Sequence, residues 1–288
     1  MNGTLDITSL NAFKVKIDNY RVKIDNAIFT ELNQRKSSSF YKPLMKALKV
    51  GKRLRPIMLI LSFESLSKRK MNPFPAAVAV ELAHTESLIH DDVIDRDFLR
   101  RGTATFCASY GNEMALLSAD FILSMILDIT ARYTDPRIAH ALAFATSEMC
   151  EGELKEVLAY KNKQKLSKNG YIEIISKKTA SLFEASTAIG AIIAGAEEDE
   201  IEALSDYGRL IGIAYQIQDD IKDLGKTTAI NLLKFLDADS EKIKTLHALS
   251  NSYTHEAKNK LEKLRVSKAK DLLIEFADFV ASPAIIRI

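Results

Sequence analysis

Apolar residues recur every three or four positions along almost the whole chain, and this spacing most constrains the fold. Near the start, for example, Leu10, Phe13, Ile17, Tyr20 and Ile24 share one helical face. The 288 residues include only 11 glycines and 6 prolines, roughly half their usual share. Tight turns need these residues, so we expect long helices joined by few turns. No strand alternation, internal repeat or low-complexity linker is evident. We predict a single all-α domain over residues 1–288, built as a bundle of roughly ten helices.

Capping residues mark where several of these helices begin and end. Asn72-Pro73 and Asp135-Pro136 each indicate an N-cap followed by proline in the first turn. Gly195 indicates a C-terminal stop, and Asn169-Gly170 a break. Helices are therefore expected over residues 7–34, 53–67, 73 to beyond 90, 112–133, 136 to about 160, 171 to about 194, 198–224, 240–263 and 267–280.

Charge and cysteine content exclude several classes of protein. The 40 basic residues nearly balance the 38 acidic ones, which is not the footprint of a nucleic-acid-binding protein. Cys107 and Cys150 cannot form a disulfide framework, and we interpret them as buried thiols in a reducing compartment. Residues 1–26 contain no apolar segment typical of a signal peptide. The longest apolar stretch, Ala188 to Ala196, is far shorter than the roughly 20 residues of a membrane span. We expect a soluble, cytoplasmic protein.

Two acidic motifs share one spacing. Asp91, Asp92 and Asp95 occupy positions i, i+1 and i+4, so the first and last share a helical face. The same spacing recurs at Asp219, Asp220 and Asp223. Like charges this close repel, and magnesium is the usual compensating cation, held by one or two carboxylates and substrate phosphates. One such motif alone is more often a solvated acidic face. Both motifs, however, follow mainly apolar turns, which favours facing acid clusters at the mouth of an apolar cavity.

Basic residues that could bind diphosphate occur in three places. Residues 51–56, Gly-Lys-Arg-Leu-Arg-Pro, set three cations at an expected helix start, where backbone N–H groups favour anions and arginine can fork phosphate oxygens. Arg100-Arg101 follows the first acidic motif, although a basic helix end that complements the helix dipole is the plainer alternative. Lys177-Lys178 is the weakest signal, because lone lysines are usually solvated.

Together these motifs resemble the trans-isoprenyl diphosphate synthases, the polyprenyl synthetase family. The match is collinear from about residue 48 to residue 226. Residues 51–56 resemble the family's GGKRxRP motif, with Val50 in place of its first glycine. The other blocks are ELxH…HDDxxD…RRG over 81–102, the KTA-containing helix over 171–183, and GxxxQxxDDxxD over 212–224. The resemblance implies an isoprenoid synthase-like fold with a central apolar cavity, and a magnesium-dependent prenyltransferase.

The resemblance also implies roles for individual residues. Asp91 and Asp95 would hold two magnesium ions on an allylic diphosphate and Asp219 a third, with Asp92, Asp220 and Asp223 assisting. Contacts to the allylic diphosphate are implied for Arg100, Lys178, Thr179 and Gln216. Contacts to the diphosphate of isopentenyl diphosphate are implied for Lys52, Arg55, His84 and Arg101. His84 taken alone could equally be a core histidine. The catalytic set would be Asp91, Asp95, Asp219 and Lys178, with no dedicated side-chain base, because the departing diphosphate takes the proton.

Product length is expected to depend on the helical turn before Asp91. Short-chain members of the family usually carry an aromatic residue four or five positions upstream, where this chain has Ser87 and Glu86. The floor of the pocket could come from another helix, for example from Phe121 or Met125. We expect a product of twenty carbons or more, geranylgeranyl diphosphate or longer. A farnesyl diphosphate synthase is the alternative.

One departure from the family leaves a second class of function open. After Asp223 the family normally has a longer loop with further lysines, whereas here Leu224-Gly225-Lys226 follows at once. A non-catalytic or weakly active subunit of a heteromeric synthase is therefore an alternative, although such partners usually lose acids from the motifs. A terpene cyclase would share the acids but would not need the second set of cations. The family is usually homodimeric, and we expect the same here.

Overall fold

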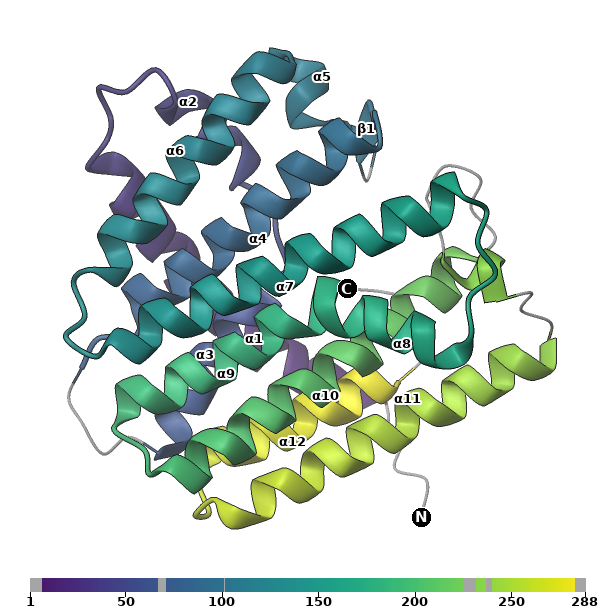
Figure 1. Ribbon diagram of the computed structural model, residues 1–288. Coiled ribbons are helices and arrows are strands. Elements are labelled where there is room, and N and C mark those ends of the chain that lie inside the picture. Colours follow the sequence, from purple (N-terminus) through teal and green to yellow (C-terminus); the bar gives the residue numbers. More distant parts are fainter. Residues whose placement is uncertain (1–6, 67–70, 101, 225–231, 237–239, 283–288) are drawn as a thin grey trace.

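The computed structural model describes residues 7–66, 71–100, 102–224, 232–236 and 240–282, which form an almost entirely helical bundle (Figure 1). Its α-helices are α1 (Ile7–Asn33), α2 (Tyr41–Ala47), α3 (Leu54–Leu66), α4 (Phe74–Ile94), α5 (Phe106–Tyr110), α6 (Asn112–Thr130), α7 (Pro136–Lys161), α8 (Lys168–Ile175), α9 (Ser181–Ala194), α10 (Glu198–Asp223), α11 (Ser240–Lys260) and α12 (Lys268–Ala281). Shorter elements are the π-turn η1 (Ser176–Ala180), the 3-10 turns η2 (Leu232–Leu236) and η3 (Leu261–Lys263), and the strands β1 (Leu99–Arg100) and β2 (Thr103–Ala104). The all-α prediction is confirmed.

Helix α9 lies at the centre of the bundle. All of its residues except Glu184 are buried, and it packs against α3, α7 and α10. In Figure 1, α7, α9, α10 and α11 run side by side in front of α1 and α3. Gly190 allows the close approach of α9 to α3, because a Cβ there would collide with the carbonyl oxygen of Leu59. A helix that is apolar on all sides must lie within the core, as α9 does.

The predicted helix ends are largely found. Asp135 caps α7, its Oδ1 accepting a hydrogen bond from the backbone N–H of Arg137 at 3.0 Å. Asn72 accepts from the N–H of Phe74 at 3.0 Å at the start of α4. Gly195 ends α9 in the left-handed conformation, with a φ of 75°. Such backbone conformations cost little only for glycine, so the chain turns there.

The structure corrects three details of the predicted elements. Asn169 and Gly170 lie inside α8, so the break predicted there is wrong. The expected helix from Tyr171 to about Ala194 is divided into α8, the π-turn η1 and α9. A π-turn adds a residue to one helical turn and often marks a functional site. The segment after α4 forms a small antiparallel hairpin, in which Leu99 pairs with Ala104. Two-residue strands are too short to show an alternating pattern in the sequence.

The two cysteines differ in exposure, and only one of them agrees with the prediction of buried thiols. Cys107 is half-buried, whereas Cys150 is exposed, so the prediction of two buried thiols is wrong for Cys150. It lies on α7, where the helical period turns it outward. Among the described residues, no helix has both the length and the apolar character needed to cross a membrane.

Candidate active site

The first acidic motif occupies the C-terminal end of α4. The charges of Lys178, Glu153 and Glu156 act on both Asp91 and Asp95, so the two carboxyls share one environment. Burial raises the pKa of Asp91 to about 7 and that of Asp95 to about 6, outweighing the positive charge of Lys178, which lowers both. Crowded, poorly solvated carboxyls of this kind are the donors that a divalent cation would stabilise in their charged form.

Asp92 has a different partner from its two neighbours. It is buried, and its Oδ1 accepts a hydrogen bond from Nε of Arg100 at 2.8 Å. Arg100 lies in β1, so the ion pair ties the hairpin to the last turn of α4. Asp92 is thus placed to orient Arg100, apart from Asp91 and Asp95. Arg101 lies outside the described residues.

Lys178 lies opposite the first acidic motif, in the π-turn η1. Its Nζ forms ion pairs with Glu153, at 2.6 Å, and with Glu156. Burial lowers the pKa of Lys178, but the charges of Glu156, Asp91 and Glu153 raise it by more than burial lowers it. The ammonium group therefore stays charged. Gly152 brings α7 against η1, because a Cβ there would collide with the backbone nitrogen of Lys178.

Sequence reasoning missed Glu153 and Glu156. Both lie on α7, three positions apart, and Glu156 is buried. The sequence signal is weak: Glu153 follows Gly152 directly, and Glu156 lies almost one helical turn later. The helix also carries Glu148 and Glu151, however, and only the packing of α7 against η1 shows which acids face Lys178.

The second acidic motif ends α10 and contains a chain of hydrogen bonds. Oδ2 of Asp220 accepts from the hydroxyl of Tyr171 at 2.8 Å, and Oδ1 accepts from Nε2 of Gln216 at 2.8 Å. Gln216 in turn accepts from the hydroxyl of Thr179 at 2.8 Å. Burial raises the pKa of Asp220 to about 7, while these two donors lower it. These hydrogen bonds link α8, η1 and α10, and Tyr171 is a third residue that sequence reasoning missed.

Arg55, at the start of α3, lies near enough to the second acidic motif for the charge of Asp219 to act on it. Its guanidinium lies 4.5 Å from the centre of the Phe183 ring, a cation–π contact. Burial lowers its pKa, against the charges of Tyr215, Glu81 and Asp219, which raise it. Among the described residues, Nε of Arg55 is buried with no hydrogen-bond partner. A buried donor of this kind is suited to an anionic ligand.

The remaining predicted residues lie before α3, on α4 and at the end of α10, and Lys52 lines a small pocket with Ile17 of α1 and Phe276 of α12. Lys52, before α3, and His84, on α4, are half-buried, as are Asp219 and Asp223 at the end of α10. Arg53 does not join Lys52 and Arg55: it is buried and forms ion pairs with Asp25 and Glu81. The expectation of three cations facing a diphosphate at this helix start is therefore wrong for Arg53. Lys226 lies outside the described residues.

Glu156 links the two acidic motifs. Its charge acts on Asp91 and Asp95 of the first motif and on Asp220 of the second. The structure thus brings residues of both motifs, 128 positions apart in sequence (219 − 91), within reach of the charge of Glu156. Within the described ranges, no three His, Cys, Asp or Glu side chains are close enough to hold a metal ion by themselves. Magnesium typically takes one or two carboxylates and completes its shell with water and substrate phosphates.

The residues proposed to set product length lie on α4 ahead of the first acidic motif. Ser87 is half-buried, and its hydroxyl donates to the carbonyl of His84 at 2.9 Å. Burial raises the pKa of Glu86 to about 7, helped by the charge of Asp120. Phe121 stacks on Phe40 with 4.7 Å between ring centres, and Met125 is fully buried. Glu86 is therefore a partly buried acid in this turn of the helix.

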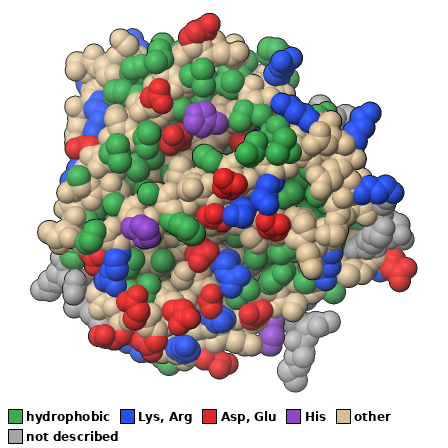
Figure 2. Space-filling view, viewed as in Figure 1, with side chains coloured by type: hydrophobic (Ala, Val, Ile, Leu, Met, Phe, Trp, Pro, Cys, Tyr) green, Lys and Arg blue, Asp and Glu red, His purple; other side chains and the backbone are tan. Residues whose placement is uncertain are grey.

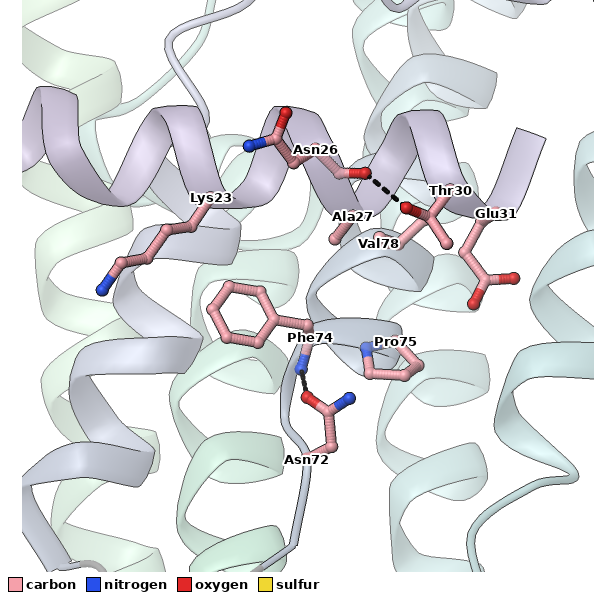
Figure 3. A pocket seen from close by; sticks show the side chains of 9 residues that line it. All are labelled: Lys23, Asn26, Ala27, Thr30, Glu31, Asn72, Phe74, Pro75 and Val78. Carbon is pink, nitrogen blue, oxygen red and sulfur yellow. Dashed lines mark hydrogen bonds between the residues drawn. The ribbon is translucent and has the colours of Figure 1, made fainter. Parts of the chain in front are cut away.

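A surface pocket lies elsewhere, between α1 and the start of α4 (Figure 3). Its volume is about 390 Å³, and Lys23, Thr30, Asn72 and Phe74 are among its lining residues. The figure shows two hydrogen bonds in the pocket wall: the Thr30 hydroxyl donates to the carbonyl oxygen of Asn26, and Asn72 accepts from the N–H of Phe74. None of the predicted site residues that the structure describes lines this pocket.

An all-helical bundle with paired acidic motifs at the ends of α4 and α10, and cations between and beside them, defines an isoprenoid synthase fold. The sequence profile of the polyprenyl synthetase family matches residues 37–273, and the chain belongs to this family.

Individual members of the family are similar to this chain over nearly their whole length. The geranylgeranyl diphosphate synthase of Methanosarcina mazei is 32% identical over 314 residues, covering 93% of this chain and 97% of the relative. The crystal structure of geranylgeranyl pyrophosphate synthetase from Pyrococcus horikoshii superposes with a TM-score of 0.82 at 29% identity, covering 94% of this chain and 98% of that one. A polyprenyl synthase from Caulobacter crescentus, solved with calcium and isoprenyl diphosphate, gives a TM-score of 0.80 at 25% identity and covers 92% and 96%.

Proposed function

We propose that this chain is a trans-prenyltransferase that condenses isopentenyl diphosphate head-to-tail with an allylic diphosphate. The observation that carries the proposal is that the first acidic motif faces Lys178 of η1, while the hydrogen bonds of Asp220 lead through Gln216 to the neighbouring Thr179. Similarity to two geranylgeranyl diphosphate synthases over more than nine-tenths of each chain supports the same reaction class. The product proposed is an all-trans polyprenyl diphosphate of twenty carbons or more.

Magnesium is the proposed cation, three ions in all, and the calcium-bound relative supports a divalent cation site in the family. Asp91 and Asp95 are the proposed ligands of two ions and Asp219 of the third. When bound, the ions neutralise the charge that develops on the departing diphosphate. Asp220 accepts hydrogen bonds from Tyr171 of α8 and from Gln216, which in turn accepts one from Thr179 of η1, so this group holds α8, η1 and α10 together.

The cations of the chain itself divide into two proposed subsites. Lys178, with Thr179 and Gln216 beside it and Arg100 held by Asp92, binds the allylic diphosphate and stabilises the charge on that leaving group. Lys52, Arg55, His84 and Arg101 bind the diphosphate of isopentenyl diphosphate. The aromatic ring of Phe183 packs under the guanidinium of Arg55 in this second subsite. The departing diphosphate takes the proton lost in the coupling.

The proposed assembly is a homodimer joined through α6 and α7. Apolar side chains gather over these helices in the upper half of Figure 2. They are 42–62% exposed in a single chain: Leu116, Leu117, Leu123 and Leu127 on α6, and Phe144, Leu154 and Leu158 on α7. So many large exposed side chains on adjoining helices favour an interface over open solvent. A cytoplasmic location is part of the proposal and rests on the sequence alone.

The proposal is tested by incubating the purified protein with isopentenyl diphosphate, magnesium and each allylic primer from dimethylallyl to geranylgeranyl diphosphate. Elongation that is lost with a chelator and in Asp91→Asn would support it. A folded protein that elongates no primer would instead favour the non-catalytic subunit. Co-purification of an active synthase would then be sought.

A further inference from the structure

Arg53 lies between the two cations proposed to bind isopentenyl diphosphate, yet it faces the interior. Its Nη1 donates to Oε1 of Glu81 at 2.6 Å and its Nε to Oδ1 of Asp25 at 2.8 Å. Nη2 donates to the carbonyl oxygen of Leu48. The side chains of Arg53 and Glu81 are only 3% and 5% exposed. One guanidinium thus joins α1, the segment before α3, and α4.

This arrangement is costly in two ways. Taking an arginine and a glutamate out of water carries a desolvation penalty that their attraction often only balances, so an apolar pair could stabilise the fold equally well. Arg53 also has a φ of 55°, in the left-handed region that non-glycine residues seldom occupy. Such strain persists where the surroundings enforce it, and it often marks functional segments.

The partners of Arg53 connect it to residues of the proposed subsite. Arg53 is next to Lys52 and two residues from Arg55. Glu81 lies three positions before His84 on α4, almost one helical turn away, and its charge also acts on Arg55. The bond between Arg53 and Glu81 therefore sets the segment that carries Lys52 and Arg55 against the helix that carries His84.

We propose that Arg53 and Glu81 are positioning residues that hold Lys52, Arg55 and His84 in register for the diphosphate of isopentenyl diphosphate. This inference rests on the proposed function. A misplacement of about 1 Å in such a site can cost up to about 100-fold in rate. The pair therefore acts on the affinity for one of the two substrates and not on the fold alone.

The chain offers a matched control in a second buried acid. Glu31 is 6% exposed and accepts two hydrogen bonds from Arg132, at 2.7 and 3.0 Å. It lies on α1, and its partner follows α6, with no proposed site residue involved. Glu31→Gln and Glu81→Gln each remove one charge from a buried glutamate paired with an arginine, although Arg132 is 35% exposed and Arg53 only 3%.

The decisive measurement is the KM for each substrate together with the thermal midpoint. Glu81→Gln should raise the KM for isopentenyl diphosphate about tenfold while the allylic KM stays within about twofold. Glu31→Gln should lower the midpoint and leave both KM values unchanged. Equal KM values in the two variants would overturn the inference.

A double variant separates positioning from stability if Glu81→Gln folds poorly. Arg53→Met with Glu81→Leu replaces the ion pair by apolar side chains of similar size and should restore the midpoint. The KM for isopentenyl diphosphate should remain raised, and its return to the wild-type value would show a structural role only. Lys52→Ala distinguishes a failure of the positioning role from a failure of the proposed isopentenyl diphosphate subsite. If it raises this KM but Glu81→Gln does not, only the positioning role fails; if it leaves this KM unchanged, the proposed subsite fails as well.

Discussion

The hydroxyl of Tyr171 lies 2.8 Å from Oδ2 of Asp220, so a fully buried phenol on α8 supports the second acidic motif on α10. Gln216 donates to the other oxygen of the same carboxyl. Both oxygens of Asp220 are thereby engaged by protein donors. This favours a role for Asp220 in orienting the motif, while Asp219 remains the proposed metal ligand.

Tyr171→Phe should impair the enzyme more than it destabilises the fold. The change leaves one oxygen of a buried carboxyl without its donor, at a cost of about 1–3 kcal/mol, and frees the end of α10 to shift. We expect a clear fall in kcat together with a lower thermal midpoint. Tyr207→Phe is the matched control, because the buried Tyr207 hydroxyl donates to the carbonyl of Leu273 at 2.6 Å. It should lower the midpoint without lowering kcat.

Lys178→Met should abolish most activity and also destabilise the protein in the absence of metal. The variant leaves Glu153, Glu156 and Asp91 without their shared counter-charge, in a partly buried place. Thermal unfolding with chelator and with magnesium checks this, and magnesium should restore part of the lost stability. The neighbouring Lys177 pairs with Glu148 at 2.6 Å. Lys177→Met should cost less than about 1 kcal/mol and keep activity; equal losses in both variants would contradict the role of Lys178.

Stability should fall as the pH rises through 7, in part because of Glu86. Burial raises the pKa of its carboxyl from 4.5 to about 7. A raised carboxyl pKa means that the folded state holds a proton that the unfolded state loses. The contribution is therefore complete below about pH 4.5 and is lost as the pH rises through about 7.

Glu86→Gln should remove this part of the pH dependence. The variant should melt at a higher temperature than the wild type at pH 8, with the difference disappearing at pH 5. Differential scanning calorimetry across this range checks the expectation. A wild-type-like pH profile in the variant would show that Glu86 titrates as it does in the unfolded chain.

Ser87→Phe should shorten the product. The residue lies one helical turn before Asp91, where an aromatic ring would block an elongating apolar tail. Chromatography of the products from a geranyl or farnesyl primer measures the change. Thr245→Phe on α11 is the control, because Thr245 is an exposed helical residue whose hydroxyl donates to the backbone of its own helix, as that of Ser87 does. A sole product of fifteen carbons from the wild-type protein would contradict the length that we propose.

Leu117→Lys should convert a dimer into monomers. Leu117 is 56% exposed on α6, and a charge there would be desolvated in the proposed interface. Light scattering after size-exclusion chromatography measures the mass. Val266→Lys, at a residue 88% exposed next to α12, should leave the mass unchanged. A wild-type protein that is monomeric at micromolar concentration would refute the homodimer.

The sequence alone is enough to predict the helical bundle and the family. Its apolar period, scarce glycine and proline, and caps such as Asp135 act locally, within one or two turns of chain, so they can be interpreted without knowing the fold. The spacing of Asp91 to Asp95, repeated at Asp219 to Asp223, is local as well. The extent of a single domain over residues 1–288 stays a prediction.

The partners of these motifs emerge only from packing in three dimensions. In the sequence, Glu153 and Glu156 resemble the other acids of α7. In the structure, Gly152 allows α7 to approach η1 closely, and this contact places both acids beside Lys178. Arg53 looks like a third diphosphate-binding cation until its buried contacts with Glu81 and Asp25 are seen. Tyr171 resembles any core aromatic residue. In each case the function depends on which neighbour lies across a helix–helix contact, and side chains far apart in sequence carry no local signal of that contact.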